Sequence, residues 1–180
     1  MKTLETIAQL IYRCRQQDQK AQMEVYQLYY KAMYNTALRM IKDPMEAEDA
    51  MQESFLKAFQ QIHSFEQQAT FGAWLKRIVV NQCLTVLKKQ HHLGVLDEET
   101  VVLADTDDSY MEEAKASKVK LLLHCMNLMK HNDQLLLNLH YLEGYDLEEI
   151  CEILNISYAS CRTQLSRARQ RLKRKMEEHE

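Results

Sequence analysis

Residues 145–175 read YDLEEICEILNISYASCRTQLSRARQRLKRK, and this stretch predicts two helices joined by a tight turn. Asp146 is a helix-capping residue, and Glu149 three positions later can bond back to the cap backbone, which is the pattern of a capping box. Asn155 tolerates the left-handed conformation that ends a helix, and Ser157 can cap the next one. The stretch therefore predicts a short first helix, a turn at Asn155 and a longer helix that begins after Ser157.

The second helix of this stretch is strongly basic. Between Ser160 and Met176 it contains seven arginines and lysines and no acidic residue. Its few apolar residues follow helical spacing and form one narrow stripe: Cys161, Leu165, Ala168 and Leu172. A short helix, a turn and a basic second helix are typical of a helix-turn-helix, whose second helix enters the DNA major groove. The alternative at this point is a basic C-terminal helix that contacts only solvent.

The composition favours an all-α protein. The 180 residues include only 3 Gly and 1 Pro, so the turns that a strand-rich architecture needs are scarce. The 5 Cys form no CxxC pair, and we expect reduced core thiols in a cytoplasmic protein. We find no signal peptide and no run of apolar residues long enough to span a bilayer. His91 and His92 have no further ligands at a recognisable spacing, so we expect neither a metal nor a cofactor.

The formal net charge of −3 conceals an uneven distribution. Residues 1–90 carry a charge of +3, residues 91–116 carry −7 and residues 117–180 carry +1. The middle segment lacks a helical period, which is typical of an extended or disordered linker. We therefore predict two small, mildly basic helical domains, 1–90 and 117–180, joined by an acidic flexible linker, 91–116.

Apolar spacing predicts several helices in the first domain. Residues 3–17 and 21–41 each have an apolar stripe, and Asp43 followed by Pro44 is a strong helix start. The helix that follows has an apolar face and a polar face. The polar face carries three residues at positions i, i+3 and i+4: Asp49, Gln52 and Glu53. By itself this helix fits an ordinary solvated acidic surface.

A further helix, predicted from Phe71 to about Gln90, combines aromatic and basic residues. Phe71, Trp74, Leu75 and Ile78 have the spacing of core residues, which accounts for much of the aromatic content. The polar residues of the same helix are left on its exposed surface: Lys76, Arg77, Asn81, Lys88 and Lys89. Cationic and hydrogen-bonding residues beside aromatics suit single-stranded nucleic acid, because bases stack and phosphates need neutralising.

In this order the motifs resemble those of an extracytoplasmic-function (ECF) sigma factor of bacterial RNA polymerase. DPMEAEDAMQESFLKAF at 43–59 is similar to the family's core-polymerase-binding helix. FGAWLKRIVVNQCLTVLKK at 71–89 is similar to its promoter-melting and −10-reading segment. YLEGYDLEEICEILNISYASCRTQLSRARQRL at 141–172 is similar to its −35-reading helix-turn-helix. The resemblance covers roughly residues 20–90 and 117–176.

The resemblance implies roles for three sets of residues. One set would meet the clamp helices of the largest polymerase subunit: Asp49, Gln52, Glu53 and Phe55. A second set would capture a flipped −10 base and hold the non-template strand: Phe65, Thr70, Phe71, Trp74, Lys76, Arg77, Asn81 and Lys88. A third set would read the −35 element: Ser160, Arg162, Thr163, Ser166, Arg167 and Arg169. Of the basic residues further along this last helix, Arg169, Arg171 and Lys173 would contact phosphates or solvent.

The resemblance also implies partners and departures. The partners would be core RNA polymerase, promoter DNA and an anti-sigma factor, and the free protein would be a cytoplasmic monomer without membrane insertion. Many family members have Asp and Arg where this chain has Thr85 and Lys88, which alters the expected −10 contacts. Gln164 stands where a basic residue is frequent, which alters the expected −35 preference.

Three other classes of protein fit less of the sequence. An autonomous helix-turn-helix regulator would need an effector-binding or dimerisation module, and it would leave the 43–59 helix without a purpose. An enzyme would need a phosphate loop, a nucleophile with its base or paired carboxylates, and no such arrangement stands out. A structural helical adaptor would leave the basic C-terminal helix unexplained. We therefore predict a sigma subunit that binds core polymerase, directs it to promoters and helps to melt DNA, with no catalysis of its own.

Overall fold

The computed structural model describes residues 6–66, 69–92 and 113–179. Every regular element in these ranges is helical, so the all-α prediction is confirmed. The chain divides into two compact units, Met1–Glu98 and Glu99–Glu180, here called the first and second unit. Most of the predicted linker, residues 93–112, lies outside the described residues, so the linker and the domain boundaries at 90 and 117 stay predictions.

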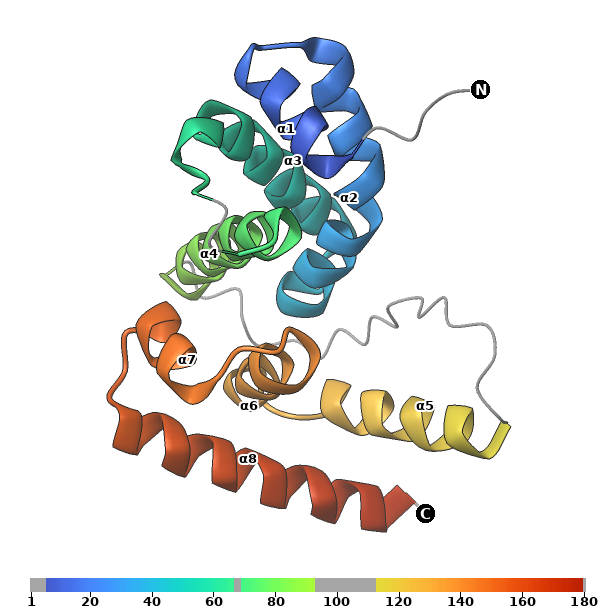
Figure 1. The fold of residues 1–180 in the computed structure, drawn as a ribbon. Helices are drawn as coiled ribbons and strands as arrows, with labels where there is room; N and C mark the ends of the chain where they lie inside the picture. Colours follow the sequence, from blue (N-terminus) through green and yellow to red (C-terminus); the bar gives the residue numbers. More distant parts are fainter. Residues whose placement is uncertain (1–5, 67–68, 93–112, 180) are drawn as a thin grey trace. The chain divides into compact units, whose positions relative to one another are not determined.

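The first unit is built from four helices (Figure 1). They are α1 (Ile7–Arg15), α2 (Gln19–Ile41), α3 (Pro44–Gln60) and α4 (Phe71–His92), with a short 3-10 turn, η1 (Ile62–Ser64), after α3. Helices α2, α3 and α4 pack against one another in pairs, and α1 packs against α2. Their facing sides supply the fully buried side chains of this core, among them Val25, Met40, Leu75, Val79 and Val80.

Side-chain caps determine where the helices of the first unit begin. Thr6 forms a capping box with Gln9 at the start of α1, and Asp18 accepts hydrogen bonds from two backbone amides at the start of α2. Asp43 accepts a hydrogen bond of 2.9 Å from the amide of Glu46, next to Pro44. Helix α1 ends before the predicted residue 17, because Gln17 adopts a positive φ of 59° and Asp18 caps the next helix, and residues 3–5 of the prediction lie outside the described residues.

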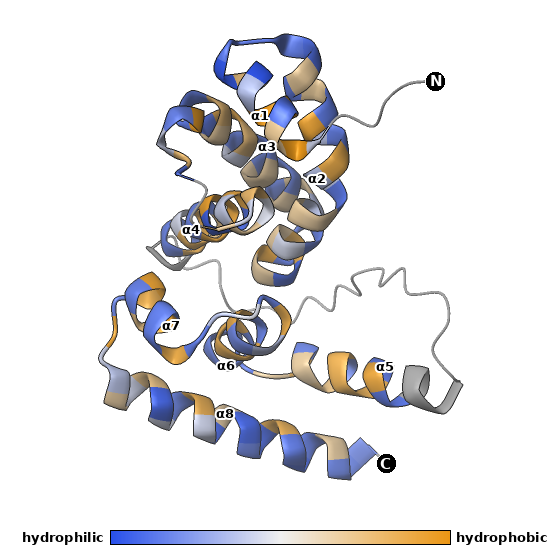
Figure 2. Ribbon diagram, viewed as in Figure 1, coloured by the Kyte–Doolittle hydropathy of each residue, from blue (hydrophilic) through white to orange (hydrophobic). Residues whose placement is uncertain are grey.

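The second unit packs one long helix along three shorter ones (Figure 1). They are α5 (Glu113–Asn127), α6 (His131–Leu137), α7 (Leu147–Leu154) and α8 (Tyr158–His179). A π-helical turn, η2 (Asn138–Leu142), continues α6. The predicted narrow stripe of α8 is buried, at Cys161, Leu165, Ala168 and Leu172. The rest of α8 is mainly hydrophilic, as Figure 2 shows.

The turn between α7 and α8 forms as the sequence predicts. Asp146 and Glu149 make both hydrogen bonds of the capping box, at 2.8 and 2.9 Å. Asn155 has a φ of 54°, the left-handed conformation that ends a helix. The Ser157 hydroxyl then accepts a hydrogen bond of 3.3 Å from the amide of Ser160. The turn is therefore specified by local capping.

An ion pair joins α6 to α8 within the second unit. Nη1 of Arg171 donates to both carboxylate oxygens of Asp133, at 2.8 Å each. The side chain of Asp133 is only 10% exposed, whereas that of Arg171 is 50% exposed. A carboxylate at such a buried position is costly without a partner, and Arg171 supplies the charge that stabilises it. Arg171 keeps the solvent contact that was expected of it, and the ion pair with Asp133 is a second role that the sequence did not indicate.

The sequence led us to expect no membrane-spanning segment and reduced cysteines in the core, and the described residues bear on both expectations. Within them, no helix combines the length and apolar character needed to cross a bilayer. All 5 cysteines are free thiols, and four of them are buried: Cys14, Cys83, Cys125 and Cys161. Cys151 is half-buried. The cysteines thus act mainly as small core residues.

Replacing Asp133 should destabilise the second unit. Asp133→Asn removes the charge opposite Arg171, and we expect a loss of roughly 1–3 kcal/mol, less than for a fully buried pair because Arg171 is half exposed. Hydrogen exchange of the α6 and α8 amides in the full-length chain would measure it. The matched control is Lys173→Ala, which breaks an exposed 3.7 Å pair with Glu177 and should cost less than about 0.5 kcal/mol. Equal protection in the two variants would contradict the role given to Asp133.

Buried thiols should resist alkylation in the folded chain. Burial raises the pKa of Cys14 to about 11, and burial together with a hydrogen bond involving Cys151 raises the pKa of Cys161 to about 11, from an ordinary value of 9.0. Alkylation needs the thiolate, so at about pH 8 iodoacetamide should modify Cys151 well before these two thiols. Peptide mass spectrometry would measure the order, with urea-unfolded chain as the control. Equal rates at all three sites in the folded chain would refute the expectation.

The same pKa shifts give a pH dependence of stability. The folded chain keeps these two thiols protonated at pH values where the unfolded chain ionises them. Their contribution to the free energy of unfolding is therefore complete below pH 9 and is lost as the pH rises towards 11. Replacing both residues by Ala should flatten the urea-unfolding midpoint across this interval.

Candidate nucleic-acid and protein interfaces

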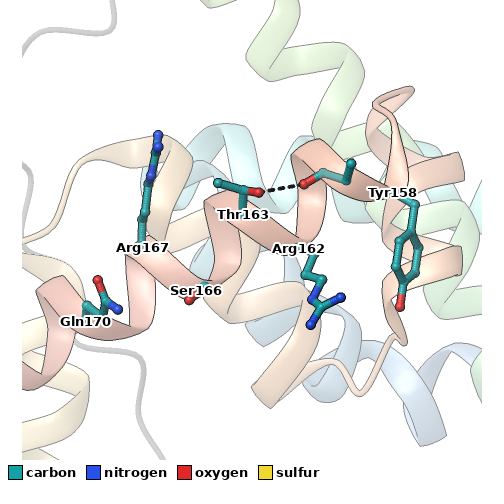
Figure 3. Close-up of a pocket in the computed structure, with 7 residues that line it drawn as sticks. Tyr158, Arg162, Thr163, Ser166, Arg167 and Gln170 are labelled. Atoms are coloured by element: carbon teal, nitrogen blue, oxygen red, sulfur yellow. Dashed lines mark hydrogen bonds between the residues drawn. The ribbon is translucent and has the colours of Figure 1, made fainter.

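The N-terminal half of α8 carries an open cavity on its surface. The cavity has a volume of about 620 Å³ and is lined by Tyr158, Ala159, Arg162, Thr163, Ser166, Arg167 and Gln170, here called the recognition surface (Figure 3). The hydroxyl of Thr163 donates 2.8 Å to the carbonyl of Ala159, which fixes its rotamer. The guanidinium groups of Arg162 and Arg167 extend from different sides of the helix. This surface therefore presents two cations and several hydroxyl and amide groups to a partner.

The structure brings together four of the six residues predicted to read the −35 element. Arg162, Thr163, Ser166 and Arg167 all line the recognition surface. Ser160 is half-buried, and its hydroxyl accepts a hydrogen bond of 2.7 Å from Gln164. Ser160 and Gln164 therefore pair with each other, apart from the recognition surface.

Arg169 lines a different groove, further along α8. It lines a mainly apolar groove of about 870 Å³ with side chains of α5, η2 and the end of α8, including Leu122, Tyr141 and Met176. The sequence prediction grouped Arg169 with Arg162 because both are basic residues of one helix. The two arginines are seven residues apart, about two turns of α8, so Arg169 lies further along the helix and lines the next groove, to which Ser166 and Gln170 also contribute.

Three residues of the recognition surface were missed by the sequence prediction: Ala159, and two larger polar side chains, Tyr158 and Gln170. Tyr158 is the first residue of α8 and is 50% exposed, and Gln170 is exposed four residues after Ser166. Both continue the helical spacing of Arg162 and Ser166, so extending that spacing in each direction would have found them.

The polar face of α3 is exposed, as predicted. Asp49, Gln52 and Glu53, here called the acidic surface, are all exposed. Leu56, one turn further along, is 63% exposed and adds an apolar side chain beside them. Phe55 is only 3% exposed and packs on Tyr26 with ring centroids 4.8 Å apart. The expectation that Phe55 contacts a partner directly is wrong, because it lies under the surface as a core residue.

Glu53 is held by a side chain of α4. Its Oε2 accepts a hydrogen bond from Nε2 of Gln82, and Oε1 of Gln82 accepts a hydrogen bond from Nζ of Lys57. Gln82 is only 6% exposed, so its amide lies at the buried boundary between α3 and α4. Nearer the other end of α4, Gln90 donates to Glu46. The sequence offered one sign of the link between Gln82 and Glu53: Gln82 is a polar residue beside the core positions Val79, Val80 and Cys83.

An aromatic cluster supports the start of α4. The rings of Phe65, Phe71 and Trp74 lie 5.4 to 5.5 Å apart, and Tyr29 of α2 lies 5.5 Å from Phe71. Phe65 and Phe71 are 4% and 3% exposed. They were predicted to contact DNA, but in this structure they are buried as core residues. Trp74 is half-buried at the edge of the cluster.

Arg15 fixes the backbone that leads into this cluster. Its Nη2 donates to the carbonyl of Phe65 at 2.7 Å, and its Nε donates to the carbonyl of Ile62 at 3.4 Å. Residues 67 and 68 of the predicted base-capturing loop lie outside the described residues. Arg15 gave no local signal in the sequence, because its partners are about fifty residues away.

One side of α4 forms an exposed polar strip. Arg77, Asn81 and Lys88 are exposed and fall within a narrow arc of the helix, and they are here called the strand-contact face. Thr85 donates 3.0 Å to the carbonyl of Asn81 on the same side. Thr70 is exposed at the start of the helix, and Lys76 is half-buried. The face carries two cations and one amide, which suits a phosphate backbone with unpaired bases.

Comparisons with known proteins match both units. The family model described as Sigma-70 region 2 matches residues 25–92, and the one described as Sigma-70, region 4 matches residues 120–172. Two solved structures share the fold. The sigma factor RpoE from Bartonella quintana, solved in complex with the anti-sigma factor NepR, has a TM-score of 0.59 and 21% identity, covering 86% of this chain and 96% of that one. CnrH in complex with the cytosolic domain of CnrY has a TM-score of 0.57 and 16% identity, covering 95% and 97%.

Curated relatives match over most of their length. The chain is 32% identical over 151 residues to the ECF RNA polymerase sigma factor SigM of Bacillus subtilis, covering 83% of this chain and 91% of SigM. It is 28% identical over 180 residues to the ECF RNA polymerase sigma factor SigW of the same organism, covering 94% and 96%. With the acidic surface on one unit and the cationic recognition surface on the other, these matches show that the chain belongs to the ECF family of RNA polymerase sigma factors.

Proposed function

We propose that this chain joins core RNA polymerase in the cytoplasm, directs the enzyme to specific promoters and helps to melt the DNA, without catalysis of its own. One observation carries the proposal. The two sigma-70 regions fall on separate helical units, and each unit exposes a surface whose charge suits a partner in initiation. The acidic surface of α3 suits a basic protein surface, and the recognition surface of α8 suits DNA.

The acidic surface of α3 is our candidate for core polymerase binding. Asp49, Gln52 and Glu53 offer carboxylate and amide groups on one exposed side of the helix. Charge pairs at an interface steer association and fix its register. The exposed Leu56 adds apolar area, and the buried Phe55 holds the helix in place from beneath.

The strand-contact face of α4 is our candidate for the opened −10 element. Opening DNA costs a few kcal/mol for each unstacked base step, and protein contacts to the separated strand must offset that cost. Arg77 and Lys88 would neutralise phosphates, and the Asn81 amide would bond a base or phosphate. Thr70, Trp74 and the half-buried Lys76 lie at the start of the same helix, where a flipped base would be received.

The recognition surface of α8 is our candidate for the −35 element. Arginine can donate two hydrogen bonds to the O6 and N7 atoms of guanine, and such a pair contributes about 1–3 kcal/mol of discrimination. Arg162 and Arg167 line the recognition surface and would make such contacts, and Thr163, Ser166 and Gln170 add shorter polar groups. Hydroxyl groups of this kind usually bind phosphates and set the register of the helix on the duplex.

Each unit offers few contacts to DNA, so we infer that the free monomer binds promoters weakly. Core polymerase would fix the distance between the two units and turn two weak contacts into one strong one. The similar RpoE was solved with an anti-sigma factor. We propose that an anti-sigma protein likewise regulates this chain by covering the surfaces that polymerase needs.

Reversing a charge on the acidic surface should weaken polymerase binding. For Asp49→Lys we expect the Kd for core RNA polymerase to rise at least about tenfold, because a charged contact is replaced by repulsion. Fluorescence anisotropy of the labelled chain with core enzyme would measure it. The matched control is Glu24→Lys, which reverses one charge at an exposed position on α2 and should leave Kd within about twofold. Equal Kd values for the two variants would contradict the assignment of α3.

Removing one arginine of the recognition surface should relax promoter specificity. We expect Arg162→Ala in holoenzyme to reduce discrimination at one −35 base pair by about tenfold, the loss of one two-bond contact. Competition binding with single-base promoter variants would measure it. Arg174→Ala, at an exposed position near the far end of α8, should weaken all sequences equally if it has any effect. A uniform loss for Arg162→Ala would show that this residue contacts only phosphates.

A further inference from the structure

We infer that Gln82 is a positioning residue, which holds the carboxylate of Glu53 in place for core polymerase binding. The inference rests on the proposed function of the acidic surface. It begins from a chain of hydrogen bonds that runs from Nζ of Lys57 to Oε1 of Gln82, and from Nε2 of Gln82 to Oε2 of Glu53. Glu53 and Lys57 are exposed neighbours on α3, whereas Gln82 is a buried residue of α4.

The amide of Gln82 is suited to link a cation and an anion. The carboxamide has an oxygen that accepts and a nitrogen that donates, so it can bond a cation and an anion at the same time. A carboxylate at position 82 would accept from Lys57 but would repel Glu53. An ammonium group would do the reverse. An apolar side chain of the same length would leave both charged groups without this partner.

The link reduces the freedom of a side chain at the proposed interface. A glutamate on a helix surface normally samples several rotamers, and ordering such a side chain on binding costs affinity. Gln82 is 6% exposed and packed between helices, so it is a rigid anchor for one oxygen of Glu53. The residue remains exposed, so its carboxylate stays accessible to a partner. Pre-ordering one such side chain corresponds to about a two- to tenfold gain in affinity.

The protein contains a second glutamine–glutamate hydrogen bond with which the bond between Gln82 and Glu53 can be compared. Gln90 of α4 donates to Glu46 of α3, so it makes the same kind of bond between the same two helices. Glu46 is not part of the acidic surface. If bonds of this kind only hold α4 against α3, the two glutamines should behave alike. If Gln82 acts through Glu53, only Gln82 should affect polymerase affinity.

The test is a double-mutant cycle on full-length chain with core RNA polymerase. The variants are Gln82→Met, which keeps the length of the side chain without its amide, Glu53→Ala, the double variant and Gln90→Met. Kd for core enzyme is the readout, and thermal unfolding of each free variant reports its folding. We expect Gln82→Met to raise Kd about two- to tenfold. We expect no further loss when it is added to Glu53→Ala, and no change for Gln90→Met.

A second substitution keeps the test decisive if Gln82→Met unfolds the first unit. Gln82→Glu keeps a polar group that can accept from Lys57 but repels Glu53, and it should weaken polymerase binding at least as much. An equal loss from Gln82→Met with and without Glu53 would overturn the inference, because it would show a general packing role. If Glu53→Ala raises Kd for core enzyme but Gln82→Met leaves it normal, the role of Gln82 is overturned and the role of Glu53 in polymerase binding stands. A normal Kd for Glu53→Ala would remove the proposed role of Glu53 as well.

Discussion

The ion pair between Arg171 and Asp133 ties α8 to α6. This helix is basic along most of its length, and its narrow apolar stripe is buried against the rest of the second unit. A buried carboxylate on α6 needs a cation, and Arg171 is the residue that supplies it. Arg171 stays half exposed while it pairs with Asp133, and Arg162 and Arg167 line the recognition surface nearer the start of the helix. The helix proposed to read DNA is thus tied to α6 by an arginine outside the recognition surface.

Several helix ends were predictable from the sequence because capping is local. Asp43, Asp146 and Asn155 act on residues within one turn, and all three behave as their positions predict. The contacts that orient the helices were not predictable. Arg171 lies 38 residues from Asp133, and Gln82 lies 29 residues from Glu53. No spacing rule connects such residues, since their proximity exists only after the helices have packed.

The roles of aromatic residues in the candidate sites were also not predictable from the sequence. Phe55, Phe65 and Phe71 stand inside motifs that the family resemblance links to polymerase or DNA, yet all three are buried. A sequence pattern cannot distinguish an aromatic ring that packs in a core from one that stacks on a base, because both follow a helical period. Burial separates the two. It leaves the polar residues of α3, α4 and α8 as the groups that can touch a partner, with the aromatic rings as their support.

The role proposed for this chain is to give core RNA polymerase its choice of promoter. Run-off transcription with purified bacterial core enzyme, with and without the chain, on a library of upstream regions would test that role. We expect defined start sites only when the chain is present, with two shared sequence elements at a constant separation upstream of them. Unchanged start sites, together with tight and specific DNA binding by the chain alone, would contradict it and identify an autonomous regulator.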